Sequence, residues 1–150
     1  MKSIRTWILI ADAGRARVVE NLGPGKGVYP VDGLASESAL PSSTHEIVAD
    51  RQGRSFESSS ATRHPMSPPT DPREQLKRSY LEMIADQLDA QLQADAFDRL
   101  IVVAPPTALG MLRQAFSSRV SAAIAGELAK DLTKTRDHNL GPHLTDVVRI

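Results

Sequence analysis

Basic side chains concentrate in the middle of this sequence. Residues 51–78 contain three acidic residues and six basic ones, which are Arg51, Arg54, Arg63, Arg73, Lys77 and Arg78. Residues 79–98 contain five acidic residues and no lysine or arginine. Because lysine and arginine bind the phosphates of nucleic acids, we predict that the six cations form a nucleic-acid-binding patch. A solvated surface with counter-charges nearby is the alternative interpretation.

Aspartate and histidine side chains are weaker candidates for functional residues. Asp12 follows an apolar run, at the end of a strand where α/β sheets often place functional groups, and Asp131 is a possible second carboxylate. The two could bind a metal in a nuclease-like site, or each could cap a turn. His64 lies beside Pro65 in the basic stretch and is a possible functional residue. The spacing of the histidines does not indicate a metal site. The sequence has no phosphate-binding glycine motif, so we predict no cofactor.

Composition limits the classes of function. Basic and acidic residues number 18 each, so no net charge draws the 150-residue chain to nucleic acid or to an anionic membrane, and binding needs a local patch. No cysteine is present, which excludes thiolate chemistry and fits a reducing compartment. The apolar stretch at residues 7–11 is too short for a signal peptide or a membrane span. We therefore expect a cytoplasmic protein with no membrane partner; the oligomeric state is open.

Apolar runs predict the strands that must position these groups. Residues 7–11 and 99–104 are nearly continuous apolar runs, typical of central strands covered on both faces. A turn at residues 12–15, with Gly14 free to adopt a positive φ, leads into a hairpin strand over 15–22. A third strand over 28–34 contains Pro30, which favours a sheet edge. We expect Leu9, Ile10, Leu100 and Val102 to be buried.

A polar loop and a long helix follow. Residues 36–70 are rich in serine and proline, which predicts a loop without regular core elements. Asp71, Pro72 and Glu74 then form a helix-start signal, and apolar residues at three- and four-residue spacing predict a helix over 72–95. This helix is basic where it begins and acidic where it ends, against the preference of the helix dipole.

The last third of the chain alternates strand and helix. After the strand at 99–104, Pro105 and Pro106 introduce a helix with Leu109, Leu112 and Phe116 inward. Residues 120–133 have helical spacing, although a sheet of this size favours another strand there. A last helix is expected over 140–148. The whole pattern predicts one α/β domain over residues 1–150, a mixed β-sheet flanked by helices.

Several segments resemble a known family. They are the opening "WILIADAGRARVVE", "DRQGRSFES", "FDRLIVVAPPTALGMLRQAF" and "ELAKDLTK". They resemble the bacterial host-attachment protein family, which is similar to the middle domain of eukaryotic and archaeal peptide-chain release factors and of Pelota. The resemblance implies a release-factor-like fold and a strand over 122–130.

The resemblance also sets expectations about function. Release factors carry a Gly-Gly-Gln tip in the corresponding loop, whereas this loop reads Asp50-Arg51-Gln52-Gly53-Arg54 and the chain has no Gly-Gly-Gln. Gln52 is a possible functional residue only. We therefore expect a non-catalytic binding module acting near the ribosome or tRNA. The alternatives are a factor whose host-attachment phenotype is indirect, and a metal-dependent hydrolase or nuclease that uses Asp12.

Overall fold

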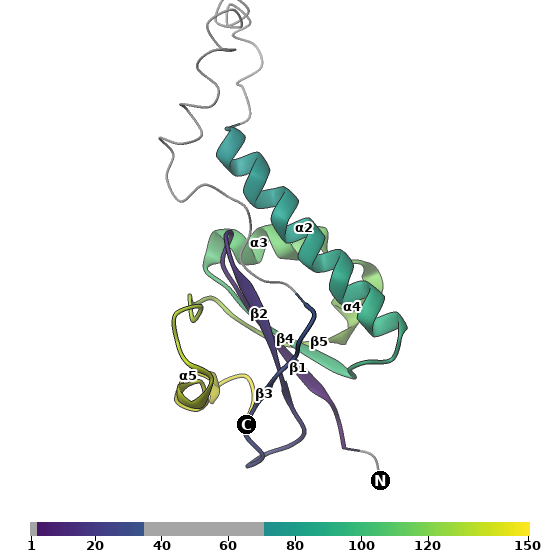
Figure 1. Ribbon diagram of the computed structural model, residues 1–150, viewed down its shortest axis with the longest axis vertical. Helices are drawn as coiled ribbons and strands as arrows, with labels where there is room; N and C mark the ends of the chain where they lie inside the picture. The colour runs from purple at the N-terminus through teal and green to yellow at the C-terminus, as the bar shows by residue number, and fades with distance from the viewer. Residues whose placement is uncertain (1–2, 35–70) are drawn as a thin grey trace, which may run out of the picture.

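A single mixed sheet organises the structure. The computed structural model describes residues 3–34 and 71–150. Its five strands lie in the order β3-β2-β1-β4-β5 (Figure 1). Strands β1, β4 and β5 are parallel, whereas β2 is antiparallel to β1 and to β3. The strands are β1 (Thr6–Ala11), β2 (Ala16–Asn21), β3 (Tyr29–Pro30), β4 (Arg99–Val103) and β5 (Ile124–Leu128). Helices flank the sheet, so the expected α/β fold class is confirmed.

Strands β1 and β4 lie at the centre, as their apolar runs predict. Every residue of β1 is buried, and so are four of the five residues of β4. Leu9 pairs with Val102 and Ile10 with Val103 in parallel register. Leu9, Ile10, Leu100 and Val102 are fully buried, which confirms the predicted core.

Three helices cover one face of the sheet. They are α2 (Pro72–Gln93), α3 (Pro106–Ala115) and α4 (Ser118–Ala123) (Figure 1). Leu81, Ile84 and Leu88 of α2 pack with Leu112 of α3 and with the strand residue Val102 in one apolar cluster. The long helix begins as predicted, because the Asp71 side chain accepts a hydrogen bond from the Arg73 amide at 2.9 Å and Pro72 occupies the first helical position.

The opposite face is covered by the C-terminal segment. Ile8, Ile10, Val19, Ile101 and Val103 pack there against four apolar residues of that segment, which are Leu132, Leu140, Leu144 and Val148. The segment contains a 3-10 turn, η2 (Asp137–Asn139), and a four-residue helix, α5 (Gly141–Leu144).

The expected helix over 140–148 is therefore wrong in its second half. The apolar spacing is real, since Leu140, Leu144 and Val148 are all buried. However, Thr145, Val147 and Val148 are β-branched and disfavour helix, so the chain continues as a turn.

Residues 118–128 contain both the helix that their apolar spacing predicts and the strand that the resemblance implies. The helix α4 ends at Ala123, and β5 follows at once from Ile124. The strand implied by the resemblance is thus present but shorter than 122–130. Helical spacing alone predicted too long a helix because its apolar positions belong to different elements. Val120 is a buried residue of α4, whereas Leu132 is a buried residue of the C-terminal segment.

Two local expectations are corrected. Gly14 is not among the positive-φ residues; the turn is held by the Asp12 carboxylate, which accepts hydrogen bonds from the Gly14 and Arg15 amides. The third strand comprises only Tyr29–Pro30, because Gly27 and Gly33 adopt φ values of 70° and 83° that end the extended run on either side. Pro30 does lie in an edge strand, as predicted.

Candidate functional site

The predicted basic patch is only partly within the described residues. Arg73, Lys77 and Arg78 lie on the first two turns of α2. Arg51, Arg54 and Arg63, together with Gln52 and His64, lie outside the described residues. The structure therefore brings three of the six cations together on one helix end, and the six-residue patch stays a prediction.

The start of α2 projects away from the core. The first buried residue of the helix is Tyr80, so its first two turns contribute no buried side chain. Figure 1 shows these turns extending past the sheet. The side chains of these turns are partly or fully exposed, so a partner has access to them.

The contacts of two of these cations are weak. The Lys77 Nζ lies 3.4 Å from the Glu74 carboxylate one turn earlier, and the Arg78 Nη1 donates to the Gln114 side chain at 3.2 Å. Pairs that are exposed or partly exposed at a protein surface contribute about 0–1 kcal/mol, so either cation can exchange its partner for a phosphate at small cost.

The charge order along α2 is confirmed by the helix bounds. The last turn has no basic residue, Glu82 lies at the middle of the helix, and Asp86 and Asp89 lie in its second half. A helix dipole favours the reverse arrangement by about 0.3–1 kcal/mol per terminal charge. At the start of α2 this cost applies to Arg73, whereas Glu74 in the same turn has the favourable sign.

The structure brings Asp12 and Asp131 together around one hydroxyl group. The Thr133 Oγ1 lies 2.5 Å from Asp131 Oδ1 and 3.4 Å from Asp12 Oδ2. Asp12 Oδ1 also accepts from the Gly14 and Arg15 amides at 2.7 and 2.8 Å, and Asp131 Oδ1 accepts from the Thr133 amide at 3.0 Å. Both carboxylates therefore have the geometry of turn caps.

The pKa of Asp131 reflects this environment. Burial raises the pKa of the Asp131 carboxyl, but hydrogen bonds from the Thr133 hydroxyl and amide, with the charges of Lys134 and Arg15, bring it below its ordinary value. The group is thus ionised near neutral pH. Within residues 3–34 and 71–150, no group of three or more histidine, aspartate or glutamate side chains is placed to hold a metal ion.

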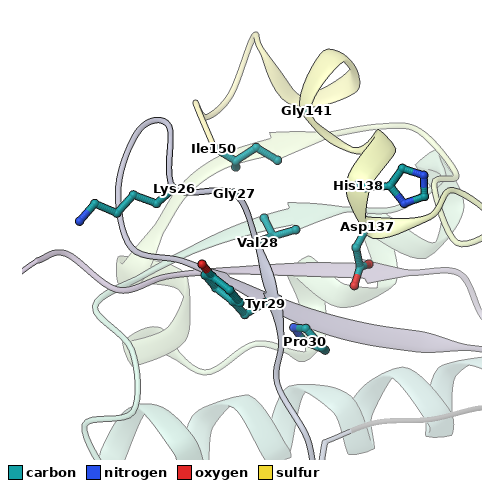
Figure 2. A pocket seen from close by; sticks show the side chains of 9 residues that line it. All are labelled: Lys26, Gly27, Val28, Tyr29, Pro30, Asp137, His138, Gly141 and Ile150. Carbon is teal, nitrogen blue, oxygen red and sulfur yellow. The ribbon is translucent and has the colours of Figure 1, made fainter.

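A groove that the sequence did not predict lies beside the edge strand. It has a volume of about 640 Å³ and is bounded by β3, by the turn before it and by the C-terminal segment (Figure 2). Val28 and Ile150 lie between the sheet and that segment, whereas the Lys26 side chain points away. A neighbouring hollow of about 420 Å³ shares Gly141 and Ile150. The lining residues are far apart in sequence and of ordinary types, so no sequence pattern could have marked the groove.

Comparisons with known proteins give one family and a distant structural likeness. The family described as "Protein required for attachment to host cells" matches residues 7–144. No curated protein sequence matches the chain. Among solved structures, the archaeal translation termination factor aRF1 is similar at 12% identity and a TM-score of 0.49, over 85% of this chain and 30% of that chain. This chain thus spans about 30% of the length of that factor.

None of the helices in residues 3–34 and 71–150 is long and apolar enough to cross a membrane.

Proposed function

We propose that this chain, which belongs to the family of proteins required for attachment to host cells, is a non-catalytic module that acts near the ribosome or tRNA in the cytoplasm. It contacts RNA phosphates through the basic start of α2, which consists of Arg73, Lys77 and Arg78. Attachment to host cells, the phenotype in the family description, is then an indirect effect of its action inside the cell.

The position of these three cations is the observation that carries the proposal. They lie on the first two turns of α2, which bury no side chain, and Arg73 lies in the first turn, where the helix dipole disfavours a cation. Lys77 is half-buried beside Glu74, and Arg78 makes an exposed contact with Gln114. Side chains placed in this way are suited to phosphates, which position a partner without reading its sequence.

Co-sedimentation with ribosomes and gel shift of unfractionated tRNA test the proposal. The wild-type chain is expected to bind one or both, with affinity that falls as salt rises. The triple variant Arg73→Glu, Lys77→Glu and Arg78→Glu is expected to lose binding while it keeps its fold, because these side chains are not part of the core.

A matched control separates a local effect from a change in net charge. Lys26→Glu, Arg119→Glu and Arg149→Glu alter three exposed cations elsewhere by the same total charge. The control variant should bind like the wild type. Equal loss in both triple variants, or no binding by the wild type to either ribosomes or tRNA, would contradict the proposal.

A metal-dependent nuclease is the second candidate, favoured only by the meeting of Asp12 and Asp131 at Thr133. It ranks second because Asp12 Oδ1 already accepts two amide hydrogen bonds. Cleavage of RNA by the purified chain with Mg²⁺ or Mn²⁺, abolished in Asp12→Asn, would support it.

A further inference from the structure

The carboxyl ends of three strands meet at one edge of the sheet. Strands β1, β4 and β5 are parallel and adjacent, so the segments that leave them lie side by side. These segments are the β1–β2 turn, the turn into α3 and the chain after Leu128. Residues 12–15 and 129–134, separated by more than a hundred positions, therefore belong to one surface.

This surface presents cations. Arg15 lies in the β1–β2 turn, and Lys130 and Lys134 lie in the chain after β5; all three are exposed. The Thr133 hydroxyl, placed between the carboxylates of Asp12 and Asp131, links the two segments. Arg15 and Lys134, one from each segment, are both near enough to the Asp131 carboxylate for their charges to lower its pKa.

The two aspartates at this edge are engaged in hydrogen bonds, and Asp131 is exposed, as the three cations are. Asp12 accepts hydrogen bonds from two amides, and Asp131 accepts from the amide and hydroxyl of Thr133. The first turn of α3 lies at the same edge, because Pro106 follows β4 within three residues. The positive end of its helix dipole adds to the favourable potential for an anion.

The basic start of α2 lies at this same end of the molecule. Helix α2 ends at Gln93, close to the beginning of β4 at Arg99, and its 22 residues extend about 33 Å back along the sheet. Its first turn must therefore lie toward the carboxyl ends of the parallel strands. Figure 1 shows the start of α2, the β1–β2 turn and the chain after β5 toward the same end.

From this placement we infer that Arg15, Lys130 and Lys134 form a second phosphate-contacting surface, here called the carboxyl-edge patch, that binds the same RNA backbone as the start of α2. This inference rests on the proposed function and extends it to residues that no sequence cluster marks. The two surfaces at one end of the chain allow an RNA strand to contact both, so their contributions to binding add.

The salt dependence of tRNA binding measures these contacts. Each lost phosphate contact reduces the slope of log K against log salt by roughly 0.7–0.9. Unfractionated tRNA should therefore bind the variant Arg15→Ala, Lys130→Ala and Lys134→Ala with a slope smaller by about 2 to 3 than that of the wild type. The charge-matched variant Lys26→Ala, Arg119→Ala and Arg149→Ala should keep the wild-type slope.

One substitution in the patch should strengthen tRNA binding instead of weakening it. Asp131→Asn keeps a side-chain oxygen that can accept from Thr133 but removes a negative charge from the patch. The affinity for tRNA should rise, by several-fold at low salt. A purely structural role for this edge predicts no gain.

The outcomes distinguish the two proposals. If the wild type binds tRNA, the α2 triple variant loses binding and the carboxyl-edge variant keeps the full slope, the patch is excluded while the proposed function stands. If the wild type binds no tRNA at any salt concentration, both are overturned. A reduced slope in the carboxyl-edge variant but not in its control, with tighter binding by Asp131→Asn, supports the patch.

Discussion

At the scale of single residues, Asp12 illustrates how one carboxylate can fix a turn. It accepts hydrogen bonds from the Gly14 and Arg15 amides and lies near the Thr133 hydroxyl. We expect Asp12→Ala to lower the free energy of unfolding by about 1–3 kcal/mol, because two amides lose their acceptor. Urea unfolding measures this loss.

The matched control is Asp12→Asn, which retains a carbonyl oxygen for the same amides. It should cost clearly less than the alanine variant. Equal losses from both substitutions would mean that charge, rather than the acceptor geometry, stabilises the turn.

The dependence of stability on pH follows from two aspartates whose pKa values are lowered. Hydrogen bonds from the Ser117 hydroxyl and from Gln93, with the charge of Arg119, lower the pKa of Asp89, and the Thr133 bonds do the same for Asp131. A lowered folded-state pKa means that the ionised carboxylate stabilises the fold at pH values above the unfolded pKa of about 3.9. This stabilisation is lost as pH falls through the folded-state pKa.

We therefore expect the free energy of unfolding to fall as the pH is lowered from about 5 to 3, and further below that. The double variant Asp89→Asn and Asp131→Asn should show a flatter decline, measured by urea unfolding at a series of pH values. A variant that declines as steeply as the wild type would assign the acid sensitivity to other carboxylates.

Residue-level prediction from sequence succeeded where the partners are local. Asp12 and Asp71 cap turns or helices through residues two or three positions away, so the alternative of a turn cap could be stated in advance. The partners of Arg17 could not be foreseen. Its guanidinium donates to Asp137 at 3.0 Å, to the Thr133 carbonyl at 3.0 Å and to the Thr135 carbonyl, all more than 115 positions away.

At the scale of elements, the sequence predicted those whose signals are redundant. Strands β1 and β4 are apolar on both faces, and α2 combines a start signal with apolar spacing. The C-terminal segment has apolar residues with helical spacing but no continuous helix, because β-branched residues follow Leu144. Apolar packing and Arg17 of β2 hold it on the sheet. The carboxyl-edge patch depends on strand order, which no local pattern encodes.

Arg17 provides a test of how the C-terminal segment is fastened. Arg17→Met keeps most of the stem but removes three hydrogen bonds, two of them to main-chain carbonyls of residues 133 and 135. We expect a loss of about 1–3 kcal/mol in the free energy of unfolding and faster amide exchange in residues 132–150, with exchange in α2 unchanged.

Arg113→Met is the control for loss of an arginine pair. Arg113 contacts Glu127 at 2.7 Å, but its side chain is 58% exposed, so the change should cost less than about 1 kcal/mol. If both arginine variants cost the same and exchange in 132–150 is unaffected, the C-terminal segment is held by its apolar packing alone.

At the scale of the whole molecule, the order of the strands bears on catalysis. From β1 to β4 to β5 the described parallel strands step in one direction, and the helices that connect them pack on one face. Ligand crevices in open α/β sheets form where the strand order reverses and helices leave on opposite faces. The three described parallel strands show no such reversal among themselves, although β2 and β3 lie on the other side of β1. The carboxyl ends of the parallel strands form the edge on which we propose that an RNA strand lies.

This architecture and the sequence lead to a prediction about release activity. The chain lacks Gly-Gly-Gln, and its carboxyl edge offers exposed cations beside two hydrogen-bonded carboxylates. We expect the purified chain to bind ribosomes that carry peptidyl-tRNA without releasing the nascent peptide above the rate in buffer. The same ribosomes treated with puromycin verify that the peptide can be released. Release by the wild-type chain that disappears in Gln52→Ala would overturn the proposal of a non-catalytic module. Loss of ribosome binding in the α2 and carboxyl-edge variants, with no release by any variant, would support a protein that acts by contact.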